Sequence, residues 1–243
     1  MKKIPEWMYK VPIAHRGYFD VLAPENSLKS FQQAIDKGFA IELDVQVLKD
    51  DTLVVFHDEQ LKRMTGVEGS ILDCTYDDIK GLRLLNTDEK IPTFQEVLEC
   101  VNGQVPLMVE FKNVSSKTKL EALGYELLKI YTGEYVMQSF NPLSVNWFRK
   151  HAPQVIRGQL SSRYENKKMS FITKWAFRNV LTNLFTKPDY VIYSIKALDT
   201  HIIHKLKRRG MPLFSYTAKS KLDYDYAMAL NIPACFEGFD PEA

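Results

Sequence analysis

Ionisable side chains of the kinds that enzymes use are concentrated between residues 13 and 69. This stretch contains I-A-H-R-G at 13–17, P-E-N-S at 24–27, E-L-D at 42–44 and V-F-H-D at 55–58. Each polar group lies at the edge of an apolar run, where an unpartnered charge is costly to remove from water. Several such groups in one stretch indicate a functional site rather than a chance arrangement.

Three carboxylates have the pattern of a metal site. Glu42 and Asp44 alternate within a β-like run, so they point to the same face, and Glu110 falls at the end of another run. Like charges so close cannot all ionise without compensation, and an all-oxygen set suits Ca²⁺ or Mg²⁺ rather than Zn²⁺. If only the E-x-D pattern of residues 42–44 is considered, ion pairs with a nearby Arg or Lys explain these carboxylates as well as a metal site does. The E-F-K at 110–112 favours a site.

Two histidines and two cations complete the candidate set. His15 and His57 are candidates for the general acid and base, because imidazole titrates near neutral pH. Arg16 and Lys112 would supply positive charge to an anionic substrate such as a phosphate. A single histidine at a strand end is more often structural, but two that flank a carboxylate cluster favour catalysis. The other histidines fall on helical patterns and are predicted to be surface or packing residues: His151, His201 and His204.

Short β-like runs alternate with amphipathic helical patterns along the chain. Setting aside the run at 53–56, the runs are 11–14, 39–47, 107–111, 135–138, 155–160, 190–193, 213–217 and 234–236. Eight β/α units in a chain of this length predict a TIM (β/α)8 barrel of one domain, residues 1–243, with a small insertion after the second strand at about 51–92. A doubly wound open sheet is the alternative, but no glycine-rich dinucleotide fingerprint follows the first run.

Two helix starts have explicit signals. A helix with Leu28, Phe31, Ala34 and Ile35 on one face is predicted to begin at Asn26 and to stop at Gly38. Another is predicted from Thr93 to Val101, because T-F-Q-E has the form of a capping box.

The overall composition narrows the class of protein. The chain has 243 residues, 45% of them hydrophobic, and a net charge of +2, which is too balanced to favour nucleic acid as a partner. Its three cysteines are widely spaced and support neither a disulfide framework nor a zinc site. No apolar run has the length of a signal peptide core or a membrane span, so we expect a cytoplasmic protein. Nothing in the sequence specifies an oligomeric state.

Together the motifs resemble the glycerophosphodiester phosphodiesterase family, in its bacterial cytosolic form. The similarity rests on H-R-G (15–17), P-E-N-S (24–27), E-L-D-V (42–45), V-V-F-H-D (54–58), L-K-R-M-T-G (61–66), E-F-K (110–112) and Q-S-F-N-P (138–142). The spacings agree as well as the letters, and the similarity covers most of the chain. It implies a TIM barrel with an inserted segment after the second strand.

The resemblance also implies an activity. It implies metal-dependent hydrolysis of glycerophosphodiesters, small molecules of phospholipid metabolism, to sn-glycerol 3-phosphate and an alcohol. Ca²⁺ or Mg²⁺ would be held by Glu42, Asp44 and Glu110; His15 and His57 would move protons, and Arg16 and Lys112 would bind the phosphate. One alternative is a lysophospholipase D reaction at the same site. Another is a barrel that binds phosphodiesters without turning them over.

The sequence departs from the family pattern near its C-terminus. The usual W-T-V-N reads Tyr216-Thr217-Ala218-Lys219, and the T-D of the closing motif becomes Glu237-Gly238. In the family these positions shape the mouth of the pocket, which implies that Tyr216, with Gln138 on an earlier strand, lines it. The departure therefore concerns substrate preference more than activity.

Residues 163–187 form a basic and aromatic segment. It contains Arg163, Lys167, Lys168, Lys174, Arg178 and Lys187, with Glu165 as its one acid. A basic amphipathic helix can lie on a membrane surface, which would suit substrates derived from phospholipids. On pattern alone, a helix that packs its apolar side against the barrel is the stronger interpretation.

Overall fold

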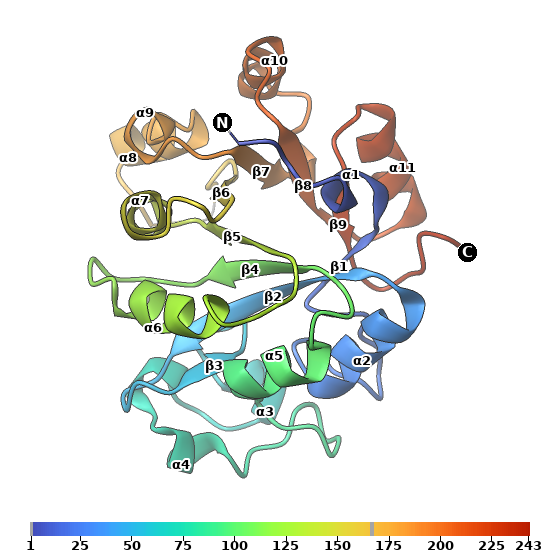
Figure 1. Ribbon diagram of the computed structural model, residues 1–243, viewed down its shortest axis with the longest axis vertical. Coiled ribbons are helices and arrows are strands. Elements are labelled where there is room, and N and C mark those ends of the chain that lie inside the picture. The colour runs from blue at the N-terminus through green and yellow to red at the C-terminus, as the bar shows by residue number, and fades with distance from the viewer. Residues whose placement is uncertain (1, 166–167) are drawn as a thin grey trace. The chain divides into compact units, whose positions relative to one another are not determined.

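The computed structural model describes residues 2–165 and 168–243 (Figure 1). These form two compact units, each described separately. The N-terminal unit comprises Ile13–Tyr135. The C-terminal unit comprises Val136–Ala243 together with the described residues through Pro12.

Three parallel strands form the centre of the N-terminal unit. They are β1 (Ile13–His15), β2 (Ala40–Val47) and β4 (Leu107–Phe111), with β2 in the middle. Every residue of β4 and all but the last of β2 are buried, as in parallel strands covered on both faces. The register sets His15 opposite Glu42 and Asp44 opposite Glu110, so the candidate side chains lie on neighbouring strands.

The N-cap of helix α2 (Leu28–Lys37) is Ser27, and the prediction that Asn26 starts this helix is wrong. The Ser27 hydroxyl accepts a hydrogen bond from the backbone N–H of Ser30 at 3.1 Å. Asn26 has a φ of 57° and donates its amide to Asp44 instead. The helix ends at Gly38 in the left-handed conformation, as predicted.

Gly17 lets the chain turn back immediately after the first strand. Its φ is +83°, and a Cβ at this position would lie 2.5 Å from Oγ of Ser30. A side chain would therefore push α2 away from the residues that precede it. This explains why a glycine follows His15 and Arg16 in the sequence.

The other two long helices of this unit are α5 (Phe94–Val101) and α6 (Lys119–Leu128). The capping box of α5 is confirmed. Glu96 accepts a hydrogen bond from the backbone N–H of Thr93 at 2.7 Å, and Thr93 accepts one from the N–H of Glu96 at 3.1 Å.

The segment between β2 and α5 forms a small layer of its own. Strand β3 (Leu53–Val55) pairs antiparallel with the end of β2. It is followed by α3 (Lys62–Thr65), the short η1 (Ile71–Asp73) and α4 (Tyr76–Ile79). Buried apolar side chains such as Phe56, Leu61 and Ile71 form a separate cluster beneath them. This is the predicted insertion.

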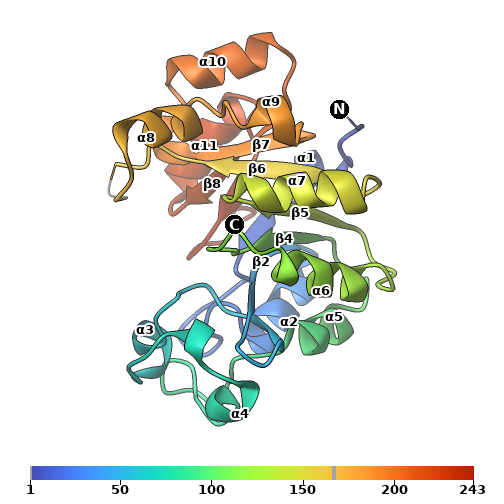
Figure 2. The same ribbon diagram turned by 90° about the vertical axis from the view of Figure 1, so that its left-hand side faces the viewer.

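The C-terminal unit contains five further strands, each parallel to the next. They are β5 (Tyr135–Ser139), β6 (Arg157–Ser161), β7 (Tyr190–Ser194), β8 (Leu213–Ala218) and β9 (Ala234–Phe236). Its helices are α1 (Trp7–Lys10), α7 (Pro142–His151), α8 (Phe171–Arg178), α9 (Asn183–Thr186), α10 (His201–Arg208) and α11 (Lys221–Ala229), with η2 (Ile195–Ala197) after β7. Figure 2 shows the succession from β5 to α8.

The predicted fold class is confirmed. With β3 set aside, eight strands alternate with helices along the chain, which is the succession of a TIM (β/α)8 barrel. The bounds differ by a few residues: β1 begins after Pro12, which has no N–H to donate to a sheet. That the whole chain is a single domain stays a prediction. Within the described ranges, no helix has the length and apolar character needed to cross a membrane.

Candidate active site

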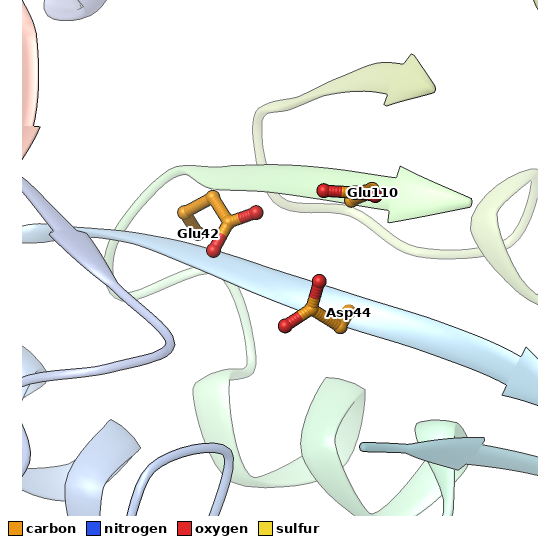
Figure 3. Close-up of side chains that lie close together, drawn as sticks. All are labelled: Glu42, Asp44 and Glu110. Carbon is orange, nitrogen blue, oxygen red and sulfur yellow. The ribbon is translucent and has the colours of Figure 1, made fainter. Parts of the chain in front are cut away.

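The three predicted carboxylates converge in the N-terminal unit. Glu42 and Asp44 project from one face of β2, and Glu110 projects beside them from β4 (Figure 3). All three are buried, and one oxygen atom of each lies within 4.8 Å of the others. The prediction that they would come together is therefore confirmed.

Glu42 and Asp44 lie inside β2 rather than at its end. They are the third and fifth residues of β2, which continues to Val47. Its last three residues pair with β3 of the insertion, with Val45 opposite Val55. The strand is therefore longer than the site requires, and its additional length supports the insertion.

Burial and mutual repulsion perturb the three carboxyl groups. Burial raises the pKa of Glu42 well above its ordinary value, and the neighbouring carboxylates raise it further. Burial also raises the pKa of Glu110. Burial also acts to raise the pKa of Asp44. Coulombic attraction to Lys112 and His57 outweighs burial and holds this pKa well below its usual range. Burial and mutual repulsion thus oppose the ionisation of Glu42 and Glu110.

His15 and Arg16 lie beside Glu42 at the end of β1. Nε2 of His15 is 3.9 Å from Oε2 of Glu42, and the backbone N–H of Arg16 donates to the same oxygen at 3.2 Å. Arg16 has a φ of 60°. This left-handed turn, followed by Gly17, returns the chain over the strand and directs the guanidinium toward the carboxylates.

His57 follows β3 and is oriented by its neighbour in the sequence. Nδ1 of His57 is 2.6 Å from Oδ1 of Asp58. Burial lowers the pKa of His57, so the ring is neutral at neutral pH. With the ring proton donated from Nδ1 to the carboxylate, Nε2 is left as the basic nitrogen.

Two cations lie against the carboxylates. Nζ of Lys112 is 3.3 Å from Glu110 and 3.4 Å from Asp44, and Nε of Arg16 is 3.4 Å from Asp44. Although burial opposes it, the carboxylates raise the pKa of Lys112 above its ordinary value, so the lysine stays protonated. The structure therefore places both predicted cations beside the acidic cluster.

Three residues of the network were given no role in the site from the sequence. Nδ2 of Asn26 donates to Oδ2 of Asp44 at 2.9 Å. Glu25 accepts from Arg16 at 2.7 Å, and Arg63 donates to both Glu25 and Asp58. All three residues belong to the quoted motifs P-E-N-S and L-K-R-M-T-G. Because Asn26 was interpreted as a helix cap, its contact with the carboxylate was not predicted.

Gln138 and Tyr216 belong to the C-terminal unit. Gln138 is buried in β5, and the hydroxyl of Tyr216 on β8 donates to the backbone carbonyl of Ser161 at 2.9 Å. Their predicted role in lining the pocket stays a prediction. Two positions that depart from the family pattern contact each other, since Nζ of Lys219 is 2.5 Å from Oε1 of Glu237.

The acidic cluster fits a hard divalent cation. The buried Oδ1 of Asp44 is 3.4 Å from Nζ of Lys112 but accepts no hydrogen bond within the described part of the chain. The donor set is three carboxylates, which suits Ca²⁺ or Mg²⁺. An ion there would relieve the repulsion that raises the pKa values of Glu42 and Glu110.

Comparison with known proteins gives one family. The sequence profile of the glycerophosphoryl diester phosphodiesterase family matches residues 15–236. The chain is 28% identical over 247 residues to a glycerophosphodiester phosphodiesterase of Caldanaerobacter subterraneus subsp. tengcongensis, covering 97% of this chain and 96% of that one. It is 27% identical over 251 residues to a glycerophosphodiester phosphodiesterase of Bacillus subtilis (strain 168), covering 93% and 83%.

A solved structure shares the fold. An Oleispira antarctica phosphodiesterase in complex with the product sn-glycerol-3-phosphate superimposes with a TM-score of 0.78 at 23% identity, covering 93% of this chain and 92% of that one. At this identity the likeness supports the TIM barrel, and the profile match over most of the chain supports the family. The chain belongs to the glycerophosphoryl diester phosphodiesterase family and is an enzyme of that family.

Proposed function

We propose that this enzyme hydrolyses glycerophosphodiesters to sn-glycerol 3-phosphate and an alcohol with the help of a divalent cation. The observation that carries the proposal is the buried carboxylate trio flanked by His15, His57 and Lys112. Relatives named glycerophosphodiester phosphodiesterase, and a structural neighbour with bound sn-glycerol-3-phosphate, support the choice of substrate.

The carboxylates of Glu42, Asp44 and Glu110 would hold the cation, which is Ca²⁺ or Mg²⁺ in this proposal. When bound, it supplies positive charge to the phosphoryl oxygens as the transition state forms. Asn26 donates a hydrogen bond to Asp44 and so fixes the orientation of that carboxylate. Conserving ligand orientation in this way is a general requirement of metal sites.

His15 and His57 would share the proton transfers. Hydrolysis needs one group to accept a proton from the attacking oxygen and another to donate one to the leaving alcohol, whether water or the glycerol hydroxyl attacks first. His57 is neutral and directed by Asp58, as proton transfer at Nε2 requires. His15 lies against Glu42, at the end of β1, the strand that pairs with β2.

Arg16 and Lys112 would bind the substrate phosphate. Lys112 stays protonated among the carboxylates, and the arginine fork can contact two phosphate oxygens at once. Two fixed cations beside one phosphate would stabilise the charge on its oxygens in the transition state better than water does.

Release of glycerol 3-phosphate from glycerophosphocholine tests the proposal. We expect EDTA, His15→Ala and His57→Ala each to lower kcat by about 10²-fold or more, because each removes a charge-stabilising or proton-transfer group. Added Ca²⁺ or Mg²⁺ should restore the chelated enzyme. Activity that EDTA leaves unchanged would contradict the cation.

Two parallel measurements separate the alternatives. Faster cleavage of lysophosphatidylcholine than of glycerophosphocholine would favour the lysophospholipase D reaction. Binding of glycerophosphocholine without turnover, with or without added cation, would favour a binding protein. His151→Ala, on α7 and stacked on Trp147, serves as the matched control and should retain full activity.

A further inference from the structure

Exposed apolar side chains are concentrated on helix α8, on the turn that follows it and on helix α9. They are Phe171, Ile172, Trp175, Leu181, Leu184 and Phe185, together called the α8–α9 face. These are six of the seventeen exposed large apolar side chains in the described ranges, within fifteen consecutive residues. Phe171 and Leu184 are each 81% exposed. Scattered exposed apolar residues need no explanation, but a concentration of this kind indicates an interaction surface.

The face is not needed to hold α8 in place. No residue of α8 is buried. The end of the helix is held instead by its backbone: the Tyr193 hydroxyl donates to the carbonyl of Arg178 at 2.9 Å, and the Ser161 hydroxyl donates to the carbonyl of Phe177 at 2.9 Å. The ring of Phe177 packs against Tyr164. The interpretation that this helix packs its apolar side against the barrel is therefore wrong for Phe171, Ile172 and Trp175.

These three side chains share one side of the helix. At about 100° per residue they fall within an arc of roughly 100°. Lys174 and Arg178 follow next around the helix, and Figure 2 shows α8 at the margin of the C-terminal unit. The arrangement is that of a helix that lies flat on an interface, with cations beside an apolar strip.

Cations predominate around the face, and Glu165, which precedes it, is the one acid of residues 163–187. Residues 168–187 contain Lys168, Lys174, Arg178 and Lys187 and no acidic residue. Lys167, which also belongs to the predicted basic segment, lies outside the described residues. A second copy of the chain would bring these cations against their own equivalents across a two-fold axis, which is unfavourable. An anionic bilayer supplies both an apolar interior and negative headgroups.

We infer that the α8–α9 face docks this enzyme on membranes that contain anionic phospholipids. Phe171, Ile172 and Trp175 insert at the level of the acyl-chain boundary, and the four cations contact the headgroups. The aliphatic stems of lysine and arginine allow this, because they lie along apolar surface while their charges stay in water. The inference is independent of the proposed catalytic function, since it concerns binding alone and uses no residue of the candidate active site.

Vesicle co-sedimentation tests the inference with the full chain. The protein is mixed with vesicles of phosphatidylcholine alone or of phosphatidylglycerol and phosphatidylcholine in equal amounts. We expect binding to the anionic vesicles only, weakened by added salt. Phe171→Ser with Trp175→Ser should weaken binding at least about tenfold, since each loses most of the transfer free energy of an apolar side chain. Lys168→Glu with Lys174→Glu should also weaken it by about tenfold or more.

Matched controls exclude unspecific effects. Leu222→Ser removes an apolar side chain that is 80% exposed on α11 of the same unit, and Arg208→Glu with Arg209→Glu makes the same change of charge at the end of α10. Neither should weaken binding. The midpoint of urea unfolding should be unchanged in all of these variants, which shows that they are folded.

Trp175 provides a spectroscopic signal that identifies the face. It is half-exposed, whereas Trp7 is buried and Trp147 is stacked on His151 of α7, so the emission of Trp175 should shift to the blue on anionic vesicles. Trp175→Phe should bind but lose most of that shift. Absence of binding to anionic vesicles, equal binding to both kinds, or binding that the face variants leave intact would overturn the inference. So would a concentration-dependent dimer that Phe171→Ser with Trp175→Ser disperses, which would make the face an interface between copies.

Discussion

Arg63 is the residue whose replacement best tests the reasoning about the active site. Its guanidinium on α3 donates to both oxygens of Asp58 at 2.5 and 3.1 Å and to both oxygens of Glu25 at 2.7 and 2.8 Å. Asp58 orients His57, and Glu25 contacts Arg16. One fork in the insertion thus fixes the partners of a proposed proton-transfer group and of a proposed phosphate-binding group.

The cost to stability should be small. The Arg63 side chain is 47% exposed, and an ion pair with that much access to water is worth about 0–1 kcal/mol. Arg63→Met should therefore lower the free energy of unfolding by about 1 kcal/mol, as measured by urea denaturation. A loss above about 3 kcal/mol would be in the range of core defects and would make Arg63 a structural residue.

The cost to catalysis should be larger. Without Arg63, Asp58 can rotate away from His57, and a displacement of about 1 Å at a reacting group costs on the order of 10²-fold in rate. That corresponds to about 2.7 kcal/mol, more than the expected loss of stability. We expect kcat for glycerophosphocholine to fall by about 10²-fold in Arg63→Met, with a smaller change in KM.

Two further variants decide whether the fork itself matters. Arg63→Lys keeps the charge but cannot contact both carboxylates in the same way, so its kcat should lie between those of the wild type and Arg63→Met. Lys62→Met, which removes the neighbouring cation paired with Glu68, should leave kcat unchanged. The reasoning is refuted if Arg63→Met retains wild-type kcat, or if Arg63→Lys is indistinguishable from the wild type.

Three other predictions concern the same unit. Burial acts to raise the pKa of Asp58, but hydrogen bonds from Arg63 and His57 lower this pKa from 3.8 to about 2. The ionised carboxylate therefore stabilises the fold above pH 3.8, and this stabilisation is lost as the pH falls through about 2. The difference in unfolding free energy between the wild type and Arg63→Met should therefore shrink as urea titrations are repeated at lower pH, and a constant difference would contradict the pairing. Asn26→Ala should weaken Ca²⁺ or Mg²⁺ binding by about tenfold or more in calorimetry, since it removes the hydrogen bond that orients Asp44; unchanged affinity would count against that role. Gly17→Ala should cost about 1–3 kcal/mol more in urea denaturation than Gly66→Ala, because both have positive φ but only Gly17 would crowd Ser30; equal losses would show that backbone strain alone matters.

Local pattern was sufficient to predict that two of the three carboxylates share a face of β2. The alternation of β2 places Glu42 and Asp44 on one face whatever surrounds the strand, because the period of a strand is two. Alternation of strands and helices likewise led to the barrel, and most residues of the parallel strands are buried, as that fold requires. These features depend on neighbours in the sequence, and they were predicted correctly.

Contacts between distant segments could not be predicted in the same way. Arg63 meets Glu25 across 38 residues, and it lies in an irregular segment where no periodicity indicates its direction. Asn26 and Ser27 are both good helix caps, so sequence alone gives no reason to choose between them. The choice is made by Asp44, a buried carboxylate on another element, because it needs the amide of Asn26 as a donor.

The candidate site is built with more negative than positive charge. Glu42, Asp44 and Glu110 face Arg16 and Lys112, so full ionisation would leave an excess of one negative charge in a buried region, and Arg16 is also engaged by Glu25. A second lysine in place of a neutral neighbour would remove that excess and with it the reason to bind a cation. Neutral hydrogen-bond donors contact two of the acids without removing the excess charge: Asp44 receives the amide of Asn26, and Glu42 receives the backbone N–H of Arg16. The raised pKa values of Glu42 and Glu110 are the consequence, because protonation is the means available to the chain itself for reducing the charge. Neutral substitutions at these positions would relieve the same repulsion, and three buried acids in their place support the proposal that a cation binds between them.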